Sequence, residues 1–261
     1  MKQLYKEILF STLILISSFI ITVLIHESGH ASFVKYFHLK GTIYQNHVEY
    51  NYLDADEKQS IWICLGGSIF SLLQLMISIL ALIKLKISNR FSCLFVCWLT
   101  FCSSVQFFGY FIVGGVTKSW NDISGVYEIT NTYLAFRIII ALLAVFMFRL
   151  VMKKLNFYFI KSMNLKFSLK IREQLNAIIL IPSIFVSIIL SVLSTPITNI
   201  ISIIYPLSFP LYVLTTYFTI LKSNLIKIEN NDIKNTDWII SLIVITIALT
   251  IDRWLSTGHS F

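Results

Sequence analysis

The feature that most constrains this chain is its series of long apolar runs. Between Ile8 and Ile25 there is no charged residue, and a membrane-spanning helix needs about 20 largely apolar residues. Reading for that length predicts about seven spans, at Ile8–His30, Ile61–Ile83, Phe91–Val113, Leu134–Val151, Leu175–Leu193, Ile200–Leu221 and Trp238–Ile251. We therefore expect an all-α polytopic membrane protein with about 6–7 transmembrane helices.

Composition excludes the main soluble classes. Of the 261 residues, 56% are hydrophobic and 13% are charged, whereas a soluble domain carries about 25% charged residues. The net charge of +8 is explained by Lys and Arg in cytoplasmic loops, so we expect no nucleic-acid partner. The four cysteines lie in apolar runs without CxxC spacing, which favours buried packing residues over disulfides or a thiolate metal site; they are Cys64, Cys93, Cys97 and Cys102.

A polar segment separates the first two predicted spans. Its part Gly41–Tyr52 is rich in β-branched and aromatic residues, which predicts one or two short strands at the membrane surface. A surface loop with chance β propensity is the alternative. The acidic residues Asp54, Asp56 and Glu57 follow, and we expect them to be solvated. We assign residues 1–130 to a membrane-embedded core and residues 131–261 to additional helices of unassigned role.

The loop charges predict an orientation. If every span crosses once, the most basic segments fall on one side, and the positive-inside rule then places the N-terminus in the cytoplasm. These basic residues are Lys2, Lys6, Lys84, Lys86, Arg90, Arg149, Lys153, Lys154, Lys161, Lys166, Lys170 and Arg172. The abundance of Ile, Lys and Asn is typical of a bacterial source, so we expect a multi-pass protein of a bacterial plasma membrane.

The chemistry-bearing motif is the pentapeptide HESGH at the end of the first span. Helical positions four apart share a face, so His26 and His30 can present their imidazoles to one metal ion. Glu27 lies beside that face, where a carboxylate can take a proton from a water molecule. Zinc suits two neutral histidines, one further ligand and one open position. The alternative is an interfacial cluster of polar residues with accidental spacing.

The third ligand is predicted from topology. Span three returns to the side of His26 and His30, so the segment Gly114–Gly125 reaches the same face, and it contains Asp122. Glu128 is the second choice, and a turn or helix-capping role is the alternative for Asp122. The remaining candidates are His38, His47 and the acidic group Asp54, Asp56 and Glu57.

An HExxH motif at the end of a hydrophobic helix resembles the site-2-protease family (M50 type) of intramembrane zinc metalloproteases. The resemblance covers residues 1–130. It implies that His26, His30 and Asp122 bind one Zn2+ ion and that Glu27 is the catalytic base. The implied partners are the lipid bilayer and a peptide or membrane-protein substrate, which the enzyme would cleave.

The chain departs from the family pattern at two positions and in its expected orientation. The family carries Leu-Asp-Gly where this chain has Asp122 within Trp-Asn-Asp-Ile-Ser-Gly, and Ser71 stands in place of an Asn. Family active sites open toward the cytoplasm, whereas the basic loops place the HExxH end outside.

The alternative function belongs to a different class of protein. It is a non-catalytic membrane protein, such as a transporter partner or immunity factor, with a structural or degenerate metal site.

Overall fold

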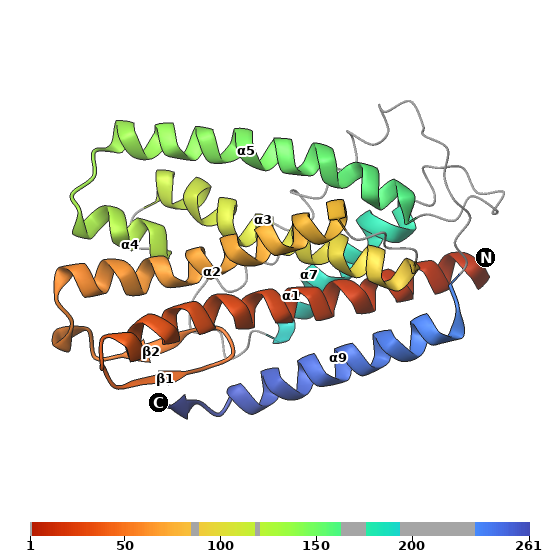
Figure 1. The fold of residues 1–261 in the computed structure, drawn as a ribbon, viewed down its shortest axis with the longest axis horizontal. Coiled ribbons are helices and arrows are strands. Elements are labelled where there is room, and N and C mark those ends of the chain that lie inside the picture. Colours follow the sequence, from red (N-terminus) through yellow and green to blue (C-terminus); the bar gives the residue numbers. More distant parts are fainter. Residues whose placement is uncertain (1, 85–88, 118–120, 163–175, 194–232) are drawn as a thin grey trace. The chain divides into compact units, whose positions relative to one another are not determined.

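The computed structural model describes residues 2–84, 89–117, 121–162, 176–193 and 233–261, and helices dominate these ranges (Figure 1). The long helices are α1 (Lys2–Tyr36), α2 (Glu57–Lys84), α3 (Arg90–Val116), α5 (Leu134–Lys161) and α9 (Asn235–Leu255). Shorter elements are the 3-10 turn Tyr52–Asp54, α4 (Asp122–Ile129), the π-helical turn Asn176–Leu180 and α7 (Ile181–Leu193). The predicted helical class is therefore confirmed.

Within the described ranges, 5 helices are long and apolar enough to cross a membrane: α1, α2, α3, α5 and α9. They match five of the predicted spans. The predicted span Ile200–Leu221 lies outside the described residues. The predicted span Leu175–Leu193 begins just outside them, and its described part consists of the π-helical turn and α7.

A small sheet follows α1, as the sequence predicted. Strands β1 (Gly41–Ile43) and β2 (Val48–Tyr50) form an antiparallel hairpin. A further strand, β3 (His259–Ser260), pairs with the other edge of β1, so the order is β2-β1-β3. The sequence does not predict β3, because two residues are too few to form a readable alternation.

Local interactions explain where α1 ends and α2 begins. His38 adopts φ 58°, and the amides of Leu39 and His38 donate to the carbonyls of Val34 and Lys35. These two bonds form a Schellman motif, which terminates a helix. At the start of α2, Asp56 and Gln59 each accept the other's backbone amide, at 2.8 and 3.0 Å. This reciprocal cap satisfies amides that the first helical turn leaves without intrahelical partners.

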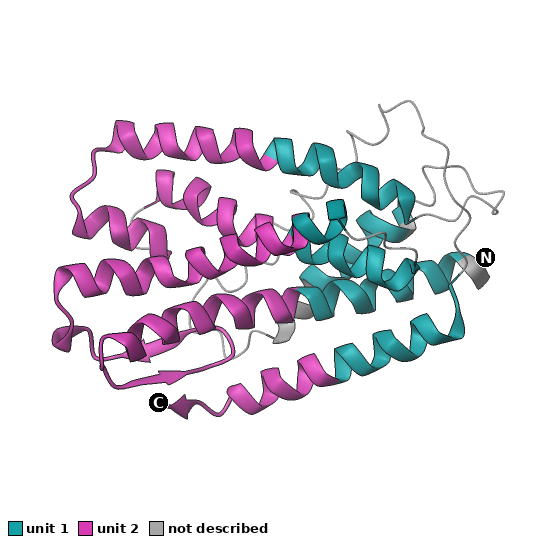
Figure 2. Ribbon diagram, viewed as in Figure 1, with its two compact units in different colours: residues 1–18, 80–101, 149–246 teal, residues 19–79, 102–148, 247–261 magenta. Residues whose placement is uncertain are grey.

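The chain divides into two compact units (Figure 2), of which unit 1 comprises residues 1–18, 80–101 and 149–246. Its core is aromatic: the ring of Trp98 lies 5.0 Å from that of Phe159, and its indole N–H donates to Ser11 Oγ at 3.0 Å. Glu7 and Arg90 form a buried ion pair. Each charge therefore has its partner inside an apolar core, as burial requires.

Unit 2 comprises residues 19–79, 102–148 and 247–261, and it contains the sheet and every predicted site residue. Helices α1 and α2 touch through two glycines. A Cβ atom at Gly66 would lie 2.7 Å from the carbonyl oxygen of Gly29 and 2.8 Å from Phe33 Cδ2. The absence of side chains at Gly29 and Gly66 therefore lets the two backbones approach.

This contact predicts that Gly66→Ala destabilises unit 2. The added methyl group would meet the backbone of α1, which cannot move independently. We therefore expect a lower melting temperature and a decrease of about 1–3 kcal/mol in the free energy of unfolding. Gly125→Ala in α4 is the matched control, because a Cβ there would meet only Cys64 Sγ at an ordinary 3.7 Å. Thermal unfolding in detergent measures both variants, and equal melting temperatures would contradict the packing argument.

Candidate metal centre

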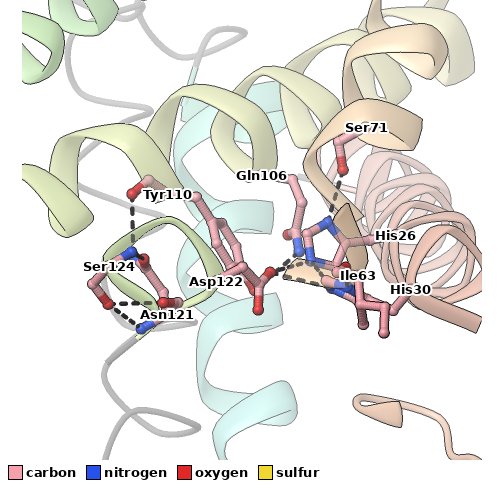
Figure 3. Close-up of polar contacts among 9 residues, drawn as sticks. All are labelled: His26, His30, Ile63, Ser71, Gln106, Tyr110, Asn121, Asp122 and Ser124. Atoms are coloured by element: carbon pink, nitrogen blue, oxygen red, sulfur yellow. Dashed lines mark hydrogen bonds and ion pairs between the residues drawn. The ribbon is translucent and has the colours of Figure 1, made fainter. Parts of the chain in front are cut away.

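His26 and His30 lie one turn apart on α1 and face the same space (Figure 3). Both are buried, with relative exposures of 1% and 8%. Their Nε2 atoms are 3.2 Å apart. The helical periodicity therefore brings the two imidazoles together as the motif predicted.

Asp122 reaches the same point from α4, whose first residue it is. Its Oδ2 lies 3.1 Å from Nε2 of His26 and 3.2 Å from Nε2 of His30. Burial raises the pKa of Asp122, but the imidazoles of His30 and His26 outweigh this effect and hold the pKa below its usual range. The carboxyl group is therefore ionised at neutral pH, the form that binds a metal.

The capping role that the sequence left open for Asp122 belongs to its neighbour Asn121. Asn121 Oδ1 accepts the backbone amide of Ser124 at 2.9 Å, and Ser124 Oγ accepts the amide of Asn121 at 2.9 Å. Asn121 Nδ2 also donates to the carbonyl of Tyr110 at 3.1 Å, which ties the start of α4 to α3. Because Asn121 caps the helix, the side chain of Asp122 is available to the histidines.

The three side chains suit a metal ion by distance and by donor type. Their ligand atoms lie within 4.8 Å of one another, and the closest pairs of atoms are 3.1–3.2 Å apart. Tetrahedral zinc with bonds near 2.0–2.1 Å separates its nitrogen and oxygen ligands by about 3.3 Å. The group therefore fits zinc, and the assignment of these residues as ligands stays a prediction.

The other nitrogen of each imidazole is also engaged. Nδ1 of His30 lies 2.6 Å from the carbonyl oxygen of Ile63, to which an Nδ1–H can donate, and its Nε2 atom faces Asp122. Nδ1 of His26 lies 3.0 Å from Ser71 Oγ. Such outer contacts set the tautomer and ring orientation of metal-binding histidines. Ser71 therefore has a structural role beside the site.

Gly67 on α2 leaves open the space beside the Nε2 atoms of both histidines. A Cβ atom there would lie 2.5 Å from Nε2 of His26 and would also collide with Nε2 of His30. Any larger residue would displace the rings. The two glycines of α2 thus have different roles: Gly66 allows the backbone of α1 to approach, and Gly67 leaves room for the histidine rings.

Glu27 lies next to this group but is not part of it. Its relative exposure is 6%, and it interacts electrostatically with His26, His30 and Asp122. A carboxylate beside a metal ion can exchange protons with a bound water, and the role of Glu27 as catalytic base stays a prediction.

The other candidate ligands do not join this group. Glu128 is exposed, and His47 is exposed and contacts Glu49 at 3.3 Å. The remaining candidates are His38, which ends α1, and the exposed acidic residues Asp54, Asp56 and Glu57. In the described ranges, His26, His30 and Asp122 form the one set of at least three such residues close enough for a metal ion.

Two residues of α3 border the site and were missed by the sequence analysis. The ring of Tyr110 lies 4.9 Å from that of His26, and Gln106 Nε2 donates to Tyr110 Oη at 3.4 Å. Gln106 is 3% exposed. An amide within an apolar run, four residues before a tyrosine on the same helical face, is the signal that could have identified them.

Comparison of this chain with protein-family models, curated proteins and solved structures finds no match.

The geometry predicts that Asp122→Asn and Glu128→Gln differ in metal content. Asp122 Oδ2 touches both Nε2 atoms, whereas Glu128 is exposed and outside the group. Zinc affinity should fall at least about tenfold in Asp122→Asn, because an amide supplies no negative charge. Glu128→Gln should keep the zinc of the unaltered protein. Elemental analysis after dialysis against a chelator measures both, and equal zinc retention would refute Asp122 as a ligand.

Proposed function

We propose that this protein is a membrane-embedded zinc metalloendopeptidase. Its substrate would be a peptide bond in a membrane-embedded or membrane-associated protein or peptide precursor. The observation that carries the proposal is the convergence of His26, His30 and Asp122 beside Glu27. The five long apolar helices support embedding in a bilayer. One of them, α1, carries the HExxH motif, so the motif would lie in a membrane-embedded helix.

The chain's own residues account for the proton transfers of peptide hydrolysis. Zinc bound at this centre would polarise the scissile carbonyl and lower the pKa of a water molecule. The Glu27 carboxylate takes one proton from that water while the water oxygen attacks the carbonyl carbon. Glu27 then delivers the proton to the leaving amine nitrogen. The Nε2 atoms of His26 and His30 would bind the zinc, and the contacts of their Nδ1 atoms with Ser71 and the Ile63 carbonyl hold both rings in place.

The hairpin β1–β2 supports a peptide substrate. A helical substrate hides its amides in internal hydrogen bonds, so cleavage needs an extended segment. Pairing with a strand edge holds a peptide in that form. Tyr50 of β2 interacts electrostatically with Asp122, and His47 in the β1–β2 connection interacts with Glu27. Both interactions support a position for the peptide along β2.

The direct test is Glu27→Gln. This variant keeps the size of the side chain but cannot accept a proton, so we expect proteolysis to fall at least about a thousandfold with zinc content unchanged. His26→Ala and His30→Ala should lose both zinc and activity. Peptides and membrane proteins are then compared between cells that carry the unaltered protein and cells that carry Glu27→Gln. A shortened species present only with the unaltered protein is a cleavage product and identifies the substrate.

Two outcomes would contradict the proposal. Equal cleavage by Glu27→Gln and the unaltered protein would remove Glu27 from the chemistry. Stoichiometric zinc with no cleaved species in any comparison would favour the alternative, a non-catalytic membrane protein with a structural metal site.

A further inference from the structure

The hairpin β1–β2 is completed by the far end of the chain. Strand β3 pairs antiparallel with β1, with Thr42 opposite Ser260 and Ile43 opposite His259. The amide of Phe261 donates to the carbonyl of Gly41 at 3.0 Å. The hydroxyls of Thr42 and Ser260 lie 3.3 Å apart.

The ring of Phe261 packs against Gly41, at a point that Val34 of the helix carrying the histidines also reaches. A Cβ atom at Gly41 would lie 2.9 Å from Phe261 Cζ and 2.9 Å from Val34 Cγ1. Val34 is fully buried and lies one turn beyond His30 on the same face of α1. One turn advances about 5.4 Å along the helix, so the anchor is close to the metal centre.

A second contact joins the segment before β3 to the hairpin. Gly258 has φ +76°, and a Cβ atom there would lie 2.6 Å from Tyr44 Cε1. Tyr44 in turn stacks on His47, with ring centroids 4.5 Å apart. The chain between α9 and β3 therefore packs closely against the connection between β1 and β2.

These contacts matter because the hairpin is short. Strands β1 and β2 have 3 residues each, and an isolated two-stranded hairpin is marginally stable at best in water. A third strand with an apolar anchor supplies the missing pairing. We propose that β3 and Phe261 are positioning elements that hold the hairpin beside the metal centre and direct an extended substrate to the outer edge of β2.

The edge assignment follows from the strand order. β3 occupies the outer edge of β1, whereas the outer edge of β2 pairs with no strand in the described part of the chain. Tyr50, which interacts electrostatically with Asp122, belongs to β2. His47, which interacts electrostatically with Glu27, belongs to the connection before β2. A hollow of about 660 Å³ lies against all three strands and includes Ser260 and Phe261 in its wall. This part of the inference rests on the proposed peptidase function.

The experiment compares Phe261→Ala with Phe261→Leu in the full chain. In Phe261→Ala we expect amide exchange in β1 and β2 to accelerate at least about tenfold, because the anchor is lost. Zinc content should not change, since no metal ligand is touched. With the substrate found by the Glu27→Gln comparison, KM should rise with little change in kcat. Phe261→Leu keeps an apolar side chain and should resemble the unaltered protein.

A cross-link provides the rescue. The pair Thr42 and Ser260 is a non-hydrogen-bonded pair next to the bonded pair Gly41 and Phe261, so its side chains are close enough for a disulfide. Thr42→Cys with Ser260→Cys, added to Phe261→Ala and oxidised, should restore slow exchange and the original KM. Reduction should reverse both.

Distinct outcomes would overturn the inference. Faster cleavage by Phe261→Ala would mean that β3 competes with substrate instead of positioning the hairpin. Loss of zinc would mean that β3 supports the whole unit, and unchanged amide exchange would mean that the hairpin does not need it. If the unaltered protein cleaves nothing, the peptidase proposal fails, while amide exchange and zinc content still decide whether β3 holds the hairpin.

Discussion

The meeting of two imidazoles and one carboxylate inside an apolar unit is the interaction on which the rest of the structure depends. Buried polar groups are costly unless they are paired, so His26, His30 and Asp122 can lie together only if each has partners. Ser71 and the Ile63 carbonyl supply those of the histidines, and the histidines supply those of Asp122. Three helices, α1, α2 and α4, thereby meet around one point.

Small residues make this convergence possible. Gly29 and Gly66 bring α1 and α2 into backbone contact, and Gly67 leaves room for the imidazoles. On the third side, the capping interactions of Asn121 set the first turn of α4 and direct Asp122 inward. The centre thus depends on residues that carry no reactive group, and their substitution should act on the metal through geometry.

Some of this could be predicted from the sequence, because it depends on local periodicity. The apolar runs gave the long helices, the spacing of His26 and His30 gave their common face, and the composition of Gly41–Tyr52 gave the hairpin. Asp122 required only that span three return to the same side. Other features depend on contacts between distant segments: β3 is two residues long, and Tyr110 and Gln106 resemble ordinary residues of an apolar helix. β3 leaves no periodic signal, and the sign of Gln106 and Tyr110 is only an amide within an apolar run, four residues before a tyrosine.

The central claim is that His26, His30 and Asp122 hold one zinc ion with a position left for water. X-ray absorption spectroscopy at the zinc edge, on the purified unaltered protein, tests it most directly. We predict one zinc per chain with two imidazole nitrogens and only oxygen as further donors, at about 2.0–2.1 Å. A protein that takes up no zinc, or a zinc spectrum dominated by sulfur ligands, would contradict the account.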